Sequence, residues 1–196
     1  HLDELKKKLV TAVNILGKLK WHLPSNVLKM MYFAHFHSHI CYVPFVWGFC
    51  SDKLVRPIQI LQNKALKHVF KVPFLHRTQE LFDGPAKGIL PIKGIMMQMT
   101  LTFIYKTLNH QMHTNIKFPL INSRTRQNCQ LQRNSPSRTN YGKRDIKTIA
   151  PIIYNKLPVD VKNSTSVNRF KYRVKKYLLN LSAELITATQ FDTHIL

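Results

Sequence analysis

The sequence predicts a mainly α-helical protein, a thumb-like helical bundle followed by a basic loop-rich segment and a C-terminal amphipathic helix, with little β structure. Apolar residues recur at helical spacing over most of the first 112 residues. The composition becomes polar and Arg-rich near residue 113, and helical spacing returns near residue 166. We therefore expect two parts, a helical domain over residues 1–112 and a basic segment over residues 113–196.

Four stretches of the first part are expected to form helices. Residues 2–20 carry leucines at helical spacing and Asp/Glu–Lys pairs four residues apart, and Pro24 ends that helix. Residues 26–49 are apolar almost all round, as in a helix enclosed by others. The last stretch, residues 92–109, has methionine and aromatic residues at the spacing of core positions.

The third of these helices is expected to begin with Ser51 as its N-cap and to end near Lys71. Its predicted buried residues recur every three or four positions and are Leu54, Ile58, Leu61, Ala65 and Val69. After it, Thr78 is expected to cap a single helical turn over residues 79–82.

The second part begins with the least regular stretch of the sequence. Residues 113–145 are rich in Asn, Arg, Ser and Thr, and we expect a long loop with short strands around residues 130–133 and 145–149. A turn over residues 151–157 then precedes an amphipathic helix over residues 166–181. The predicted apolar stripe of this helix is Val167, Phe170, Val174, Leu178 and Leu181.

Positive charge is the most unusual property of the composition. The chain has 30 Lys and Arg residues against 9 Asp and Glu residues, a formal net charge of +21. The segment from residue 117 to 176 holds fifteen of the cations and only two acids. Such a surplus attracts polyanions, of which nucleic acid is the commonest and an anionic membrane surface the main competitor.

Nucleic-acid contacts are predicted on four elements: the first helix, the third helix, the Arg-rich loop and the last helix. The predicted contact residues are Lys6, Lys7, Lys8, Lys64, Lys67, Lys71, Arg124, Arg126, Arg133, Arg138, Arg144, Lys147, Arg169, Arg173 and Lys176. No zinc-finger, homeodomain or RNP-type pattern is present, so sequence-specific base readout is not expected.

The sequence indicates no catalytic centre and no cofactor. Its carboxylates are scattered singly, and its six glycines form no phosphate-binding loop. His35, His37, His39 and Cys41 alternate, but on a helix only the pairs four residues apart share a face, and the two pairs point in different directions, so no metal site is expected. The three cysteines, Cys41, Cys50 and Cys129, cannot form an even disulfide framework and include no CxxC pair, so we expect an intracellular protein of the nucleus or cytoplasm.

The stretch from residue 30 to 51 has the length of a membrane span and no charged Lys, Arg, Asp or Glu. Its three histidines and Pro44 favour a buried helix instead, because histidines near the middle of a span are costly. We expect no integral membrane insertion.

Two short motifs are the most specific features of the sequence: Leu61-Gln62-Asn63-Lys64-Ala65 and Ala150-Pro151-x-x-Tyr154-Asn155-x-Leu157-Pro158. With further landmarks in order along the chain, they resemble the region that follows the palm in reverse transcriptases of Jockey-like LINE-type (non-LTR) retrotransposons. The landmarks are Leu23-Pro24, His37-Ser38-His39-Ile40, Val46-Trp47-Gly48, Ile89-Leu90-Pro91-Ile92, Thr125-Arg126, Tyr141-Gly142 and Phe170-Lys171. The family more often has Trp where Tyr154 stands.

The resemblance implies the thumb and post-thumb region of an RNA-directed DNA polymerase. The palm with its catalytic aspartates and the endonuclease domain lie outside this sequence, so we expect part of a longer protein with no catalysis of its own. The implied role is to hold template–primer and element RNA during target-primed reverse transcription, with RNA, DNA and the palm/fingers domain as partners. The alternatives are a peripheral protein of anionic membranes and a decayed element remnant without function.

Overall fold

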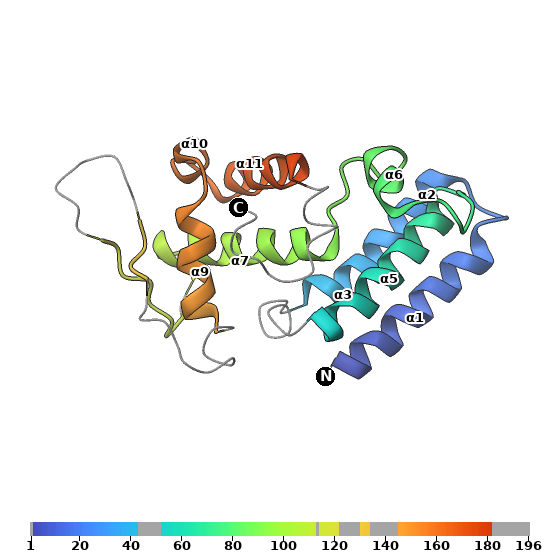
Figure 1. Ribbon diagram of the computed structural model, residues 1–196, viewed down its shortest axis with the longest axis horizontal. Helices are drawn as coiled ribbons and strands as arrows, with labels where there is room; N and C mark the ends of the chain where they lie inside the picture. Colours follow the sequence, from blue (N-terminus) through green and yellow to red (C-terminus); the bar gives the residue numbers. More distant parts are fainter. Residues whose placement is uncertain (1, 43–51, 113, 122–129, 134–144, 182–196) are drawn as a thin grey trace.

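The computed structural model describes residues 2–42, 52–112, 114–121, 130–133 and 145–181. It is mainly helical, as predicted, and within these ranges β structure is limited to one isolated antiparallel bridge between Leu120 and Leu131. The helices before residue 84 lie at one end of the molecule, and those after residue 145 lie at the other end around α7, Ile92–Leu108 (Figure 1). One continuous set of buried apolar side chains joins the two ends.

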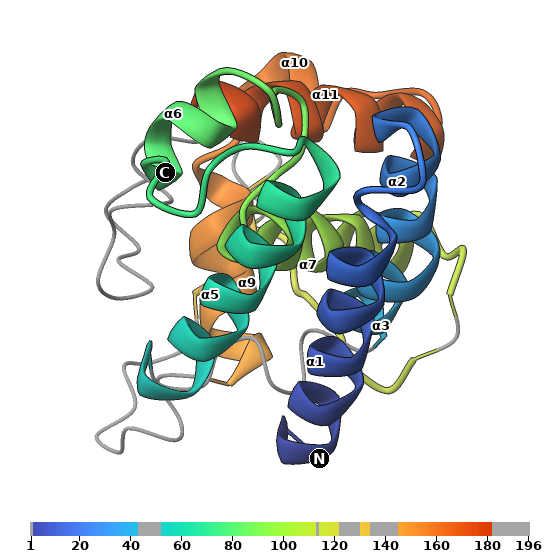
Figure 2. The same cartoon turned by 90° about the vertical axis from the view of Figure 1, so that its right-hand side faces the viewer.

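Helices α1, Leu2–Leu19, and α5, Asp52–Val69, run side by side and confirm the first and third predicted helices (Figures 1 and 2). The buried residues of α1 recur at helical spacing, as Leu5, Leu9, Val13 and Leu16. The predicted stripe of α5 is only partly correct, because Leu54 is exposed and Val55 and Leu66 are buried in addition to Ile58, Ala65 and Val69. Ser51 lies outside the described residues.

The apolar stretch after Pro24 forms one helical rod, composed of α2, Ser25–Met31, the π-helix η1, Tyr32–His37, and α3, Ser38–Cys41. Tyr32 and Phe36 stack within it, with ring centroids 5.3 Å apart. The prediction that this helix is enclosed on all sides was wrong. The rod packs on α1 and α5 and, through α3, on α7, but Met30 is 70% exposed. The part predicted as helix beyond residue 42 lies outside the described residues.

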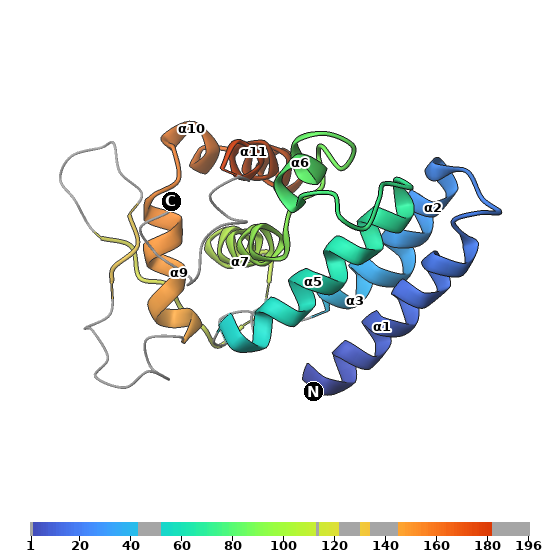
Figure 3. The ribbon, with the colours of Figure 1, turned by 45° about the vertical axis from the view of Figure 1, so that its right-hand side comes forward.

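The helix that is enclosed on all sides is α7. Figure 3 views it nearly end-on, with α5 on one side and α9, Ile146–Asn155, and α11, Val167–Asn180, on others. Its side chains are buried almost all round, which explains its apolar composition. The helix predicted over residues 92–109 is therefore confirmed, and it is the element on which both ends of the molecule pack.

Three local predictions were wrong. Thr78 is the first residue of helix α6, Thr78–Asp83, rather than its cap, and its hydroxyl accepts a hydrogen bond from the Asn63 amide at 3.2 Å. The strand expected over residues 145–149 and the turn expected over residues 151–157 fall instead on α9. Pro151 lies inside α9, where the burial of Ile149, Ala150 and Ile153 offsets the backbone hydrogen bond that proline cannot make.

The last predicted helix is confirmed as α11, which follows the short helix α10, Val159–Lys162. The Ser166 hydroxyl caps it by accepting a hydrogen bond from the Arg169 backbone N–H at 3.3 Å. Phe170, Val174 and Leu178 are buried against α7. None of the helices in the described ranges is both long and apolar enough to cross a bilayer.

Candidate nucleic-acid interface

Helix α11 presents five cations and no carboxylate. Arg169, Lys171 and Lys176 are exposed, whereas Arg173 and Lys175 are half-buried. Tyr172 lies among them and is 69% exposed. In the described part of the chain, no carboxylate forms an ion pair with any of the five. The outer side of α11 is therefore a positively charged surface with an aromatic ring in it, the two features from which nucleic-acid-binding faces are built.

Contacts with α7 hold α11 rigidly in place. The ring of Phe170 stacks on Tyr105 with centroids 4.2 Å apart, and the Tyr105 hydroxyl donates to the carbonyl oxygen of Ser164. The Gln98 side chain donates to the backbone carbonyl of Lys171 at 3.2 Å. Because the cations stand on a helix fixed by these contacts, little entropy is lost in ordering the backbone when a ligand binds.

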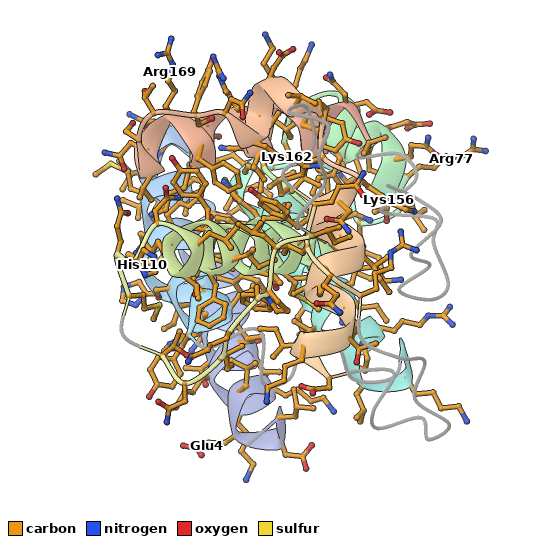
Figure 4. The ribbon with its side chains drawn as sticks, turned by 90° about the vertical axis from the view of Figure 1, so that its left-hand side faces the viewer. Glu4, Arg77, His110, Lys156, Lys162 and Arg169 are labelled. Carbon is orange, nitrogen blue, oxygen red and sulfur yellow. The ribbon has the colours of Figure 1, made fainter. Side chains whose placement is uncertain are left out.

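Two cations near α11 serve the fold. The Arg173 guanidinium donates to the backbone carbonyl of Asp160, which connects α11 to α10. Lys162 donates to the carbonyl of Asn155 at 2.9 Å and lies 5.5 Å from the centre of the Tyr154 ring, which connects α10 to α9. Figure 4 shows Lys162 and Lys156 in the region of α9 and α10, Arg169 at the α11 end, and Glu4 at the opposite end of the molecule.

The predicted lysines of α1 lie beside carboxylates. Lys6 pairs with Asp3 at 3.5 Å and Lys8 pairs with Glu4 at 3.4 Å, whereas Lys7 is exposed. The acidic first turn of α1 therefore neutralises much of the charge that the sequence places there.

The predicted lysines of α5 lie near the other end of the α1–α5 pair. Lys64 is exposed. Burial lowers the pKa of His68, and the positive charges of Lys20 and Lys64 lower it further. Lys67 donates to the carbonyl of Phe74, and its ammonium lies 5.3 Å from the centre of the Phe74 ring. Lys71 ends α5 with a positive φ of 55°. These three lysines are thus separated along the helix pair from those of α1 (Figure 1).

The Arg-rich segment is described only where it meets the helices. Arg124, Arg126, Arg138 and Arg144 lie outside the described residues, whereas Arg133 and Lys147 are exposed within them. Residues 119–121 and 130–132 pair through the backbone N–H groups of Ile121 and Gln132, both at 2.8 Å from their acceptors. This pairing brings together the two ends of the stretch that contains Arg124 and Arg126.

Asn155 extends that pairing from the side of α9. The side-chain oxygen Oδ1 of Asn155 accepts a hydrogen bond from the Leu131 N–H at 2.7 Å, and its side-chain nitrogen Nδ2 donates to the Leu131 carbonyl at 2.9 Å. The amide thus binds residue 131 as a neighbouring strand would. The motif that contains Tyr154 and Asn155 therefore has a structural role, which is to attach residues 130–133 to α9.

The motif over residues 61–65 is also structural. Gln62 is buried, and its side-chain nitrogen donates to the Tyr32 hydroxyl at 3.0 Å and to the Leu90 carbonyl at 2.8 Å. Gln59 accepts from the first backbone N–H of α7, that of Ile92, at 2.9 Å, and it donates to both Gln62 and Asn63 at 2.9 Å. Every polar atom of the Gln62 amide is satisfied, as burial requires. These amides attach α5 to η1 and to the start of α7.

The histidine-cysteine stretch contains a contact but no metal cluster. The Cys41 sulfur lies 3.0 Å from Nδ1 of His37. Burial raises the pKa of Cys41 to about 11, and burial, with the Lys175 charge second, lowers the pKa of His37. Both groups are therefore neutral at pH 7, and Cys41 is not an activated nucleophile. Within the described ranges, which omit Cys50 and Cys129, no three His, Cys, Asp or Glu side chains converge.

The structure adds residues that the sequence reasoning did not select. Tyr172 lies among the α11 cations, Lys175 is near His37, and Lys156 is beside Arg133. The position of Tyr172 could have been read from helical spacing, because Arg169 and Lys176 are three and four residues away. Lys156 gave no such signal, because its neighbour Arg133 is distant in sequence.

Comparison with known proteins identifies no relative. No family model, no curated protein and no solved structure matches this chain.

Proposed function

We propose that this chain is a non-catalytic nucleic-acid-binding part of a retrotransposon RNA-directed DNA polymerase of the LINE type, acting inside the cell and without a cofactor. The observation that carries the proposal is α11, a helix without a carboxylate, where Arg169 and Lys176 are exposed on one side and Lys171 is exposed on another. Positive charges on one helix repel one another, and a sugar–phosphate backbone relieves that repulsion.

The two motifs that carry the resemblance support this proposal indirectly. The Gln59–Gln62–Asn63 amides attach the first helices to α7, and Asn155 attaches the basic segment to α9. Both motifs therefore position basic elements around α7. This agrees with an accessory role, holding template–primer and element RNA, in which catalysis belongs to the palm of the parent polymerase.

A second candidate function is binding to an anionic membrane surface. Phe74 and Leu75 are adjacent in the loop after α5 and are 71% and 92% exposed, and Lys67 and Lys71 lie beside them. Exposed apolar side chains flanked by cations are typical of interfacial membrane contacts. The densest positive charge lies away from this loop, in residues 117–176, which hold fifteen cations and only two acids, and for this reason we place nucleic acid first.

Binding titrations separate the two functions. We expect the affinity of the chain for single-stranded RNA to fall by about 10³- to 10⁵-fold between 50 and 200 mM salt, which is the range for about 6–10 phosphate contacts. The measurement is fluorescence anisotropy with labelled RNA, repeated with duplex DNA.

Flotation with vesicles that contain phosphatidylserine, at the same salt concentrations, is the comparison. If the chain floats with these vesicles while its RNA affinity is weak and independent of salt, the membrane function replaces the nucleic-acid function. If the Phe74→Ser/Leu75→Ser variant retains salt-dependent RNA binding, the exposed loop is not the source of that binding.

A further inference from the structure

A groove of about 430 Å³ lies where residues 130–133 meet the C-terminal end of α9. Arg133 and Lys156 line it together with Gln130, Gln132 and Asn155, and no described carboxylate contributes to the lining. Two cations without a counter-ion in one concave site are unusual, because charged side chains ordinarily pair or separate.

Arg133 and Lys156 are close enough to influence each other. The pKa of Lys156 is lowered, first by partial burial and second by the charge of Arg133. The two cations therefore repel each other in the groove, and an anion placed between them is attracted to both.

The chain fixes both cations through a single side chain. Asn155 hydrogen-bonds to both backbone groups of Leu131, at 2.7 and 2.9 Å, and Leu131 is buried. Lys156 directly follows Asn155, and Arg133 comes two residues after Leu131. The two backbones that carry the cations are thus held together before any ligand arrives, which lowers the entropic cost of binding.

We propose that this Arg133–Lys156 groove binds one phosphate group of a nucleic-acid backbone, shared between the guanidinium of Arg133 and the ammonium of Lys156. The guanidinium fork matches phosphate oxygens, and the neighbouring Gln130 and Gln132 amides provide neutral donors of the kind that contact sugar and phosphate. The identity of the ligand rests on the proposed function; the anion site itself rests on the groove.

Sharing a phosphate has a distinct signature in the salt dependence of binding. Arg133→Gln and Lys156→Gln are each expected to weaken binding of a short single-stranded RNA by about tenfold while leaving the slope of log affinity against log salt unchanged, because one cation still neutralises the phosphate. The double variant is expected to lower the slope by about 0.7, the value for one phosphate of a single strand.

The matched control is Lys53→Gln/Lys87→Gln, which removes two exposed charges from other elements. This control is expected to retain the wild-type slope, and thermal unfolding of each variant shows whether it is folded. The shared site is refuted if each single variant already lowers the slope, or if the double variant binds as the control does.

A second readout separates this inference from the proposed function. If the wild-type chain shows no salt-dependent RNA binding, the proposed function fails, and the groove is then tested with inorganic phosphate at constant ionic strength by NMR. Saturable shifts of the Leu131 backbone and Asn155 side-chain amide signals that disappear in the double variant support an anion site. The absence of such shifts in the wild-type chain overturns it.

Discussion

Lys71 has a backbone conformation that is unfavourable for a residue with a side chain. Lys71 ends α5 with φ at 55°, and the Val72 N–H donates back to the Lys67 carbonyl at 3.1 Å. This is the left-handed helix end that glycine favours, since a Cβ is disfavoured there.

We predict that Lys71→Gly raises the free energy of unfolding by about 0.5–1 kcal/mol, because it removes the cost of a side chain in the left-handed region. Urea unfolding measures the change. Lys71→Ala is the control, since it removes the same charge and keeps the Cβ. Equal stabilities of the two variants would contradict the assigned helix end.

The environment of Cys41 makes its thiol less acidic than an exposed one. Burial raises its pKa to about 11, from an ordinary value of 9.0. The stabilisation from the partly buried thiol is therefore complete below pH 9 and is lost as the pH rises through about 11.

We predict that Cys41 is alkylated by iodoacetamide much more slowly in the native chain than in the urea-unfolded chain at pH 8, as peptide mass spectrometry can measure. Equal rates in the two states would show that the thiol is not protected.

At the scale of elements, amide side chains join segments that are distant in sequence. Asn155 satisfies both backbone groups of Leu131, and Gln59 accepts from the first backbone N–H of α7. Such contacts explain why amide residues recur in both motifs, because an amide can donate and accept at one site.

We predict that Asn155→Ala lowers the free energy of unfolding by about 1–3 kcal/mol, because it leaves the N–H and C=O of the buried Leu131 without partners. The control is Asn163→Ala, which changes an exposed asparagine at the end of α10. Chemical denaturation of both variants measures the difference. If Asn155→Ala costs no more than Asn163→Ala, the Leu131 backbone does not depend on this amide.

Most of the helices could be predicted from the sequence, and the exceptions have a common cause. Apolar residues at helical spacing predicted α1 and α11, because one face of each packs on the rest of the protein. The strand and the turn expected around Pro151 were wrong, because proline argued against the helix that tertiary burial stabilises. The enclosed helix was assigned to the apolar rod after Pro24 although α7 has that environment, because apolar composition does not reveal which partners cover a helix.

Across the molecule, the cations differ in whether they have a neighbouring carboxylate or carbonyl partner. The α1 lysines have Asp3 and Glu4 beside them, and Arg173 is engaged with a backbone carbonyl. The exposed cations of α11 have neither kind of partner in the described ranges. Sequence counting located a dense run of cations in residues 117–176, but it could not separate cations that stabilise the fold from cations that are open to a ligand.

The same limit applies to the Arg133–Lys156 groove. Arginine content marked the segment around Arg133, whereas Lys156 belongs to a motif whose visible features are apolar and aromatic. Only the Asn155–Leu131 hydrogen bonds bring these two cations into one groove. Site residues that come from distant segments depend on tertiary contacts, and no spacing rule reveals them.

The most direct test of a phosphate-binding role for α11 is the salt dependence of RNA binding by the Arg169→Gln/Lys171→Gln/Lys176→Gln variant. We predict that its slope of log affinity against log salt is smaller than that of the wild-type chain by about two, roughly 0.7 for each single-strand phosphate that the variant no longer neutralises. A variant with Lys29, Lys53 and Lys87 changed to Gln removes the same charge from other elements and is expected to keep the wild-type slope. Equal slopes for the two triple variants would contradict the account.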